Sequence, residues 1–270
     1  MGLFRKLTSS SRGSKAQPQS TSTPASAAPP STSASTSRSH PAQQPHASLS
    51  RQQENALAAL AKHDTVFLVD DSGSMRNVWS EVLAPALSGV VRTASAHDED
   101  GVDLCFFNSP ERCTSRSADE ILAVFQRVQP RYTTPTKDAV RRVLEPYMQS
   151  FEQWHSNGKA KGQPRPKPLN LIILTDGAPD EGQSPEEVIV DVARRLDQLR
   201  APPFQVGLSF VQIGNYSEAA EHLRSLDDDL REKHSIRDMV DTTLYEGSLN
   251  ADYLLKACLG GINRSIDKQN

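Results

Sequence analysis

Residues 66–75 read Val-Phe-Leu-Val-Asp-Asp-Ser-Gly-Ser-Met, and this stretch decides the fold. Its apolar, partly β-branched start is typical of a strand that is buried on both faces of a parallel sheet. The strand ends at Asp70, and hydroxyl side chains follow at alternate positions, Ser72 and Ser74. Carboxylate and hydroxyl oxygens suit hard cations such as Mg²⁺, but short polar residues also form turns and helix caps. We therefore expect either part of a metal site or a capped strand-to-helix turn.

A second apolar segment repeats this design further along the chain. Residues 169–176 read Leu-Asn-Leu-Ile-Ile-Leu-Thr-Asp, so that a strand again ends at a single carboxylate, Asp176. Between the two segments, Thr133-Thr134-Pro135-Thr136 precedes a helical pattern at about 137–155. Helix capping by the first loop explains neither Asp176 nor the threonines. Two carboxylates brought close together would repel each other, so we expect a divalent cation to offset their charge.

The set Asp70-x-Ser72-x-Ser74, Thr134 and Asp176 resembles the metal-ion-dependent adhesion site of von Willebrand factor type A (vWA) domains in residue type, order and spacing. We identify the chain as a member of that family over residues 62–262. The resemblance implies that these five residues bind Mg²⁺, or Mn²⁺ or Ca²⁺ in its place. In the family, glycines usually precede the threonine, whereas Arg131-Tyr132-Thr133 stand here, which predicts a stiffer or differently posed loop.

The resemblance also implies a fold and a function. The fold is an α/β, doubly wound, mainly parallel (Rossmann-like) sheet with strand order 3-2-1-4-5-6, flanked by helices. Its strands ending at Asp70 and Asp176 would then be neighbours at the point where the connections reverse, which is where such sheets bind ligands. Asp71 is not at a ligand position, so we expect it either to orient the loop or to face solvent.

The function implied is that of a protein-interaction module. In the family, the metal keeps one coordination position free, and an Asp or Glu of a protein partner fills it. A metal-independent vWA scaffold is the alternative, and a Mg²⁺-dependent hydrolase is a weaker one. We do not expect an enzyme, because Ser72 stands where a phosphatase would need a carboxylate, and the Gly-x-Ser-x-Gly motif of serine hydrolases is absent.

Composition divides the chain into a tail and one domain. Residues 9–50 are mostly Ser, Thr, Pro, Ala and Gln, and such a segment cannot bury enough apolar surface to offset its ordering entropy. We therefore expect residues 1–55 to be a disordered tail and residues 263–270 to be a short C-terminal tail. No Asp or Glu precedes Glu54, so the tail is basic, yet the net charge of −3 gives no reason to expect nucleic-acid binding.

The sequence favours an intracellular, cytoplasmic protein. Its three cysteines, Cys105, Cys113 and Cys258, show no CxxC spacing, which is typical of reduced thiols. No apolar run reaches the roughly 20 residues of a membrane helix. The first residues leave alternatives open: Gly2 allows N-terminal lipidation and weak membrane contact, although Lys6 replaces the preferred Ser or Thr, and the Ser-rich basic start resembles an organellar transit peptide.

Between the two tails, apolar strands alternate with amphipathic helices, which favours an α/β fold. We expect strands at 65–70, 102–107, 112–115, 169–175, 206–213 and 237–242, and helices at 77–97, 118–128, 137–155, 185–200, 217–231 and 251–264. Ser184 and Glu187 have the spacing of a capping box for the fourth of these helices, with Pro185 at its first position.

Overall fold

The structure of the chain is a computed structural model that describes residues 57, 61–94 and 100–258. The expected tails at 1–55 and 263–270, and the ends of the first and last expected helices, lie outside the described residues. The strands are β1 (Asp64–Val69), β2 (Val102–Phe106), β3 (Arg112–Ser115), β4 (Leu169–Thr175), β5 (Val206–Gln212) and β6 (Val240–Thr243). The longer helices are α2 (Ala84–Ala94), α3 (Ala118–Arg127), α4 (Thr136–Gln153), α5 (Glu186–Gln198) and α6 (Ser217–His234), and residues 251–258 form one more.

The six strands form one sheet in the order β3-β2-β1-β4-β5-β6, as expected. All neighbours pair in parallel except β2 and β3, which are antiparallel. The order reverses between β1 and β4, and Val69 lies opposite Leu174 in that pair. Asp70 and Thr175, one residue further on each strand, therefore lie side by side at the carboxyl edge of the sheet. The doubly wound α/β fold is confirmed.

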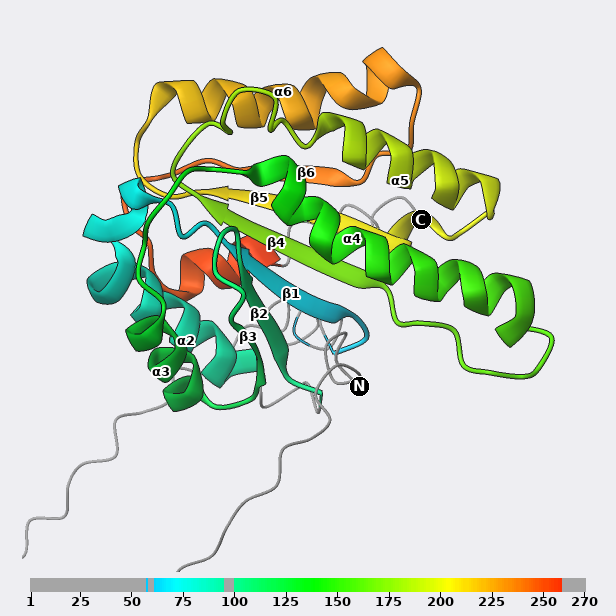
Figure 1. Ribbon diagram of the computed structural model, residues 1–270, viewed down its shortest axis with the longest axis horizontal. Helices are drawn as coiled ribbons and strands as arrows, with labels where there is room; N and C mark the ends of the chain where they lie inside the picture. The colour runs from blue at the N-terminus through cyan, green and yellow to red at the C-terminus, as the bar shows by residue number, and fades with distance from the viewer. Residues whose placement is uncertain (1–56, 58–60, 95–99, 259–270) are drawn as a thin grey trace, which may run out of the picture.

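Helices cover both faces of the sheet (Figure 1). Alternate residues of β1 point to opposite faces, as the period of two in a strand requires. Phe67 and Val69 belong to the core under α2, α3 and the helix at 251–258. Val66 and Leu68 belong to the core under α4, α5 and α6. Because both faces are buried, the central strands consist mostly of apolar residues.

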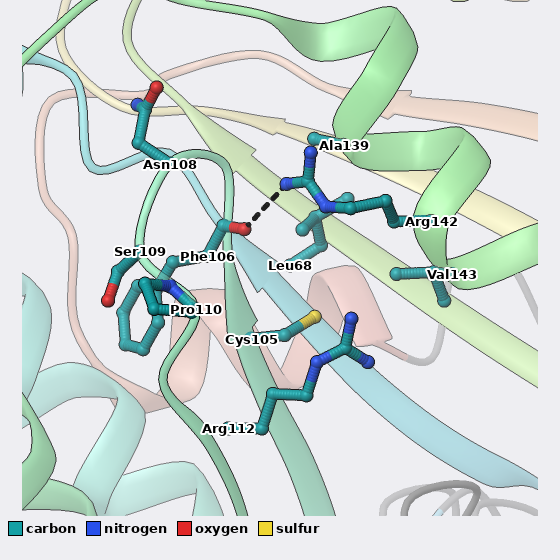
Figure 2. A pocket seen from close by; sticks show the side chains of 10 residues that line it. All are labelled: Leu68, Cys105, Phe106, Asn108, Ser109, Pro110, Arg112, Ala139, Arg142 and Val143. Atoms are coloured by element: carbon teal, nitrogen blue, oxygen red, sulfur yellow. Dashed lines mark hydrogen bonds between the residues drawn. The ribbon is translucent and has the colours of Figure 1, made fainter.

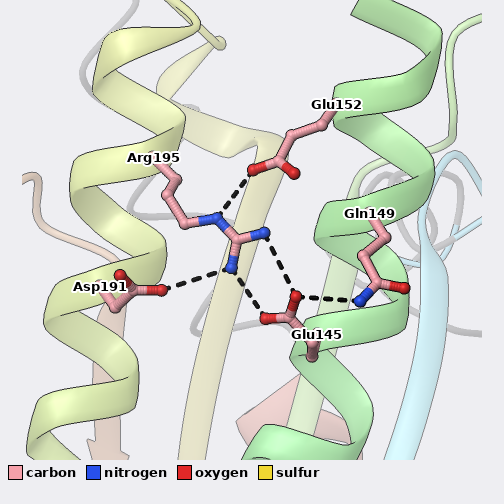
Figure 3. A network of polar contacts seen from close by, with 5 residues as sticks. All are labelled: Glu145, Gln149, Glu152, Asp191 and Arg195. Atoms are coloured by element: carbon pink, nitrogen blue, oxygen red, sulfur yellow. Dashed lines mark hydrogen bonds and ion pairs between the residues drawn. The ribbon is translucent and has the colours of Figure 1, made fainter.

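Helices α4 and α5 are also joined at their surface by Arg195 (Figure 3). Its Nε donates to Glu152 at 2.7 Å, and its Nη1 donates to Glu145 at 2.8 Å. Asp191, one turn earlier on α5, lies 3.3 Å from the same Nη1. A guanidinium that bridges two helices through several carboxylates fixes their relative position better than an isolated surface ion pair.

The helix expected at 77–97 begins irregularly. A 3₁₀ turn at Gly73–Asn77 and a π turn at Trp79–Leu83 precede α2, and Leu83 N donates to Val78 O at 2.8 Å. Pro85, which has no N–H to give to the preceding turn, follows directly and takes the second position of α2. The regular part of this helix therefore begins at Ala84, next to the proline.

The capping box expected at Ser184 and Glu187 is wrong. Pro185 is the N-cap residue of α5 and the helix begins at Glu186, with no side-chain cap hydrogen bond. Glu187 instead pairs with Lys137 of α4 at 2.5 Å. Because Glu187 forms this ion pair with the neighbouring helix, its side chain does not cap its own helix.

The described cysteines are all free thiols, and Cys105 and Cys258 are buried. Cys105 is a residue of the core under α4, α5 and α6. Within the described part of the chain, no helix is long and apolar enough to cross a membrane.

Candidate metal centre at the carboxyl edge of the sheet

Four of the five residues expected to bind the cation come together. Asp70 follows β1, and its Oδ1 accepts a hydrogen bond from Ser72 N at 2.8 Å. The hydroxyls of Ser72 and Ser74 lie 3.0 Å apart, and Ser74 Oγ donates to Asp176 Oδ1 at 2.8 Å. Asp70, Ser72 and Asp176 are buried, whereas Ser74 is exposed. The cluster of oxygens therefore opens to solvent on the side of Ser74.

These contacts argue against a simple helix cap. Ser72 is the N-cap residue of the turn at Gly73–Asn77, but its side chain makes no cap hydrogen bond. The hydroxyls of the loop are directed towards a carboxylate on another strand instead. The donor set consists of carboxylate and hydroxyl oxygens, which is the chemistry that Mg²⁺ accepts.

The electrostatics of the two carboxylates also fit a cation. Burial raises the pKa of Asp70 to about 6, and the nearby Asp176 charge acts in the same direction. Burial likewise raises the pKa of Asp176. Among the described residues, no cationic side chain forms an ion pair with either carboxylate. A bound divalent ion would supply the missing positive charge.

Thr134, the fifth residue, lies in a loop held by backbone contacts, and its hydroxyl makes no hydrogen bond to the cluster among the described residues. Gly73 N donates to Tyr132 O at 3.2 Å, so the threonine loop lies against the loop of Ser72 and Ser74. Thr134 N donates to Asp180 Oδ2 at 3.0 Å, and Asp180 N returns a bond to Thr134 O at 3.1 Å. Sequence reasoning missed Asp180, since nothing marks one more acidic residue in a polar loop as the anchor of a distant segment.

Tyr132, which stands where vWA domains usually have a glycine, has a strained backbone conformation. Its φ of 70° lies in the left-handed region, which a non-glycine residue enters at a cost of about 1 kcal/mol or more. The side chain is 67 % exposed, and Arg131 stacks over its ring at 4.9 Å. The loop therefore keeps a backbone shape suited to glycine and presents an aromatic ring beside the site.

Asp71 does not face solvent, and that alternative is wrong. Its side chain is 1 % exposed, and its two oxygens accept hydrogen bonds from Asn108 N at 2.7 Å, Asn108 Nδ2 at 3.1 Å and Ser109 N at 2.9 Å. Asn108 Nδ2 also donates to Thr133 O at 3.0 Å. Asp71 thus ties the loop of Ser72 and Ser74 to the end of β2, and through Asn108 to the threonine loop.

Thr175 is a further residue of the site that the sequence left without a role. Its hydroxyl donates to Asp70 Oδ2 at 2.7 Å, so both carboxylate oxygens of Asp70 accept a hydrogen bond. The only feature of the sequence that could have indicated this role is the polar side chain of Thr175 at the end of an apolar strand. Among the described residues there is no group of three or more His, Cys, Asp or Glu side chains that could hold a metal, so a cation here would depend on the hydroxyls.

The fold and the site define an α/β domain with a cluster of carboxylate and hydroxyl side chains at the switch point of its sheet. No protein-family model matches the sequence, and no curated protein matches it significantly. Among solved structures, the chain is similar to the vWF domain of the type V pili tip protein Mfa5 from Porphyromonas gingivalis, with a TM-score of 0.38, 9 % identity, and coverage of 76 % of this chain and 95 % of that one. A TM-score this low does not establish kinship, so the fold assignment depends on the sheet order above.

Proposed function

We propose that this chain is a vWA-type protein-interaction module that binds a divalent cation, Mg²⁺ by preference, through Asp70, Ser72, Ser74, Thr134 and Asp176. The observation that carries the proposal is the hydrogen-bonded cluster of Asp70, Ser72, Ser74 and Asp176 at the switch point of the sheet. Its two buried carboxylates need a positive charge, and its exposed side leaves room for one more ligand.

We propose that this additional ligand is an Asp or Glu of a protein partner. A carboxylate on the exposed side of the cluster would complete the metal coordination and bring more negative charge to the ion. The exposed ring of Tyr132 lies in the loop that packs on Gly73, so it would contact a partner docked there. We favour a binding module over a hydrolase because both carboxylates of the cluster are proposed metal ligands, and no histidine among the described residues forms a hydrogen bond with them.

One observation favours the alternative of a metal-independent scaffold. Both oxygens of Asp70 are already satisfied by Ser72 N and Thr175 Oγ1, so the loop can hold its shape through protein contacts. A scaffold would use the same rigid loops to bind a partner without an ion. The two functions differ in whether metal is needed.

The first prediction concerns the ion. Calorimetry on the full chain should detect one Mg²⁺ or Mn²⁺ site, and Asp176→Ala should weaken it by more than about 100-fold, because even groups that only orient a ligand are worth about 10- to 100-fold in metal affinity. Asp119→Ala, at an exposed carboxylate on α3, is the matched control and should bind as the wild type does. Equal binding by wild type and Asp176→Ala would rule out the site.

The second prediction separates the ion from the partner. Thr134 contributes a neutral oxygen, so Thr134→Ala should reduce Mg²⁺ affinity less than Asp176→Ala does. It should still reduce Mg²⁺-dependent recovery of a partner from native lysate, because the partner's carboxylate can bind the ion only if the other ligands hold it in octahedral geometry. Thr133→Ala is the control, since Thr133 is exposed and uses only its carbonyl in the loop.

The comparison is made with Mg²⁺ and with EDTA. Full recovery by Thr134→Ala together with loss in Thr133→Ala would show that the wrong threonine was assigned. Recovery that survives EDTA in the wild type would establish the metal-independent scaffold instead.

A further inference from the structure

The exposed large hydrophobic side chains among the described residues are two tyrosines, and both stand at the carboxyl edge of the sheet. Tyr132 is 67 % exposed in the threonine loop, and Tyr216 is 56 % exposed shortly after β5. At the end of β5, Ile213 N donates to Thr175 O at 2.8 Å, so this strand ends beside the one that leads to Asp176. Aromatic side chains are enriched in protein interfaces, and the placement of both rings on one edge fits a partner that docks there.

Tyr132 supports an arginine at this edge. Its φ of 70° strains the backbone, and burial of the ring does not offset that strain, because most of the side chain is in solvent. The guanidinium carbon of Arg131 lies over the ring, 4.9 Å from its centroid. A guanidinium stacked on an aromatic face directs its N–H groups outward in its own plane, where a carboxylate can accept two of them. The strained tyrosine therefore orients Arg131 for an acidic group.

Arg76 brings a second positive charge to the same place. It is an exposed residue of the 3₁₀ turn that contains Ser74, and its Nη2 donates to Pro130 O at 3.4 Å. Its guanidinium therefore lies next to the residue that precedes Arg131. Among the described residues, neither Arg76 nor Arg131 forms an ion pair with a carboxylate.

The exposed charges of the loops around the cluster are mostly positive. Arg76 and Arg131 are exposed in the loop of Ser72 and Ser74 and in the threonine loop, and Glu181 is exposed in the loop after β4. The other acidic side chains of these loops outside the cluster, Asp71 and Asp180, accept hydrogen bonds from N–H groups of neighbouring loops. A divalent ion would offset the two carboxylates of the cluster, so the face that a partner meets would carry an excess of positive charge.

Arg112 and Arg142, which lie around the pocket between β2 and α4, do not add to this charge (Figure 2). Arg142 donates to two backbone carbonyls at the end of β2, and Arg112 already interacts within the protein. Asn108, whose Nδ2 donates to Thr133 O, directs its side chain away from both guanidinium groups. The positive charge of the docking face therefore comes from the two arginines of its own loops.

We propose that the partner presents an acidic segment rather than a single carboxylate: one Asp or Glu binds the ion, and a second, a few residues away, pairs with Arg131 and Arg76. This inference rests on the proposed metal-dependent function and adds a requirement for the sequence of the partner. The second carboxylate would meet an arginine that the ring of Tyr132 already orients, so less side-chain entropy is lost on pairing. The same ring would contact the segment between the two acidic residues.

The test is calorimetry on the full chain in Mg²⁺ with two capped Gly-Ser peptides of equal length. The first carries a central Asp with Glu at the second and third positions on either side. In the second, Gln replaces every Glu, so that a single carboxylate remains. The wild type should bind the first peptide about tenfold more tightly, because an exposed ion pair contributes up to about fivefold in affinity and two are available.

The double variant Arg76→Ala/Arg131→Ala should bind the two peptides alike, because the groups that distinguish them are gone. Arg165→Ala is the matched control, since Arg165 is exposed in the loop before β4, at the opposite edge of the sheet, and it should keep the full preference. Tyr132→Gly should weaken the acidic peptide by about threefold or more. It should melt no lower than the wild type, because glycine adopts this φ without strain.

The outcomes separate this inference from the metal function. Equal binding of both peptides by the wild type, no binding of either, or a preference that survives in the double variant would overturn the acidic segment. The Mg²⁺ titration of the wild type and Asp176→Ala would still decide the metal site on its own. A preference for the acidic peptide that persists undiminished in EDTA and is lost in the double variant would support the pairing with Arg76 and Arg131 and overturn the metal function instead.

Discussion

Replacing Asp71 by alanine should lower the free energy of unfolding by about 3 kcal/mol or more. The carboxylate is buried and accepts three hydrogen bonds, two of them from the backbone N–H groups of Asn108 and Ser109. Truncation would leave these donors without their acceptor, and each buried unsatisfied group costs about 1–3 kcal/mol. Water entering the gap would recover part of that cost, so the sum of three full penalties is an upper limit.

Denaturant unfolding of both proteins in EDTA measures this loss without any contribution from a bound ion. Asp119→Ala again serves as the control for loss of a carboxylate, and it should change stability by about 1 kcal/mol or less, since Asp119 is exposed in the first turn of α3. Asp71→Asn should fall between the two, because one oxygen remains while the new NH₂ faces N–H donors. An Asp71→Ala variant as stable as the Asp119 control would show that the end of β2 is held by other contacts.

The fold followed from patterns that are local in the sequence. The apolar run before Asp70 and the one before Asp176 each predict a fully buried strand, and both strands are central. Once two such strands are neighbours, their carboxyl ends must meet at one edge, so the convergence of the two aspartates could also be predicted. These strands form because their apolar residues are buried, and the type and spacing of those residues can be read directly from the sequence.

The remaining features of the site depend on partners from distant segments, which the sequence does not reveal. Asp70 and Asp71 are chemically identical neighbours, yet Asp70 accepts a hydrogen bond from Thr175 at the end of β4, whereas Asp71 binds the end of β2. Asp180 anchors the backbone of Thr134 across a long separation in sequence. Glu187 had the spacing of a capping box and instead pairs with Lys137. In each case a tertiary contact decides between local alternatives of similar energy.

The second large effect is expected at the opposite end of β1, where Asp64→Asn should stabilise the protein at about pH 7 by roughly 1–3 kcal/mol. Asp64 Oδ1 is buried and has no hydrogen-bond partner among the described residues. Burial raises the pKa of Asp64 to about 6 from 3.8, although Lys167 opposes the shift. The folded state therefore holds this proton more tightly than the unfolded chain does.

The sign of the pH dependence follows from that difference. The stability that the protonated group contributes is fully present below about pH 4 and is lost as the pH rises through about 6, where the buried carboxylate ionises. Asparagine cannot ionise, so the advantage of Asp64→Asn should be largest at about pH 7 and should shrink towards zero at about pH 4.

Denaturant unfolding at both pH values measures this advantage, and Asp100→Asn provides the opposite case. The Lys167 ammonium lowers the pKa of Asp100 to about 2, so its charged form is favoured in the folded state, and its replacement should destabilise at about pH 7. Both aspartates interact with Lys167, so a general effect of removing negative charge near that lysine would shift both variants in the same direction. Stabilisation of Asp64→Asn alone, confined to the higher pH, is the result that only the buried, unpartnered carboxylate explains.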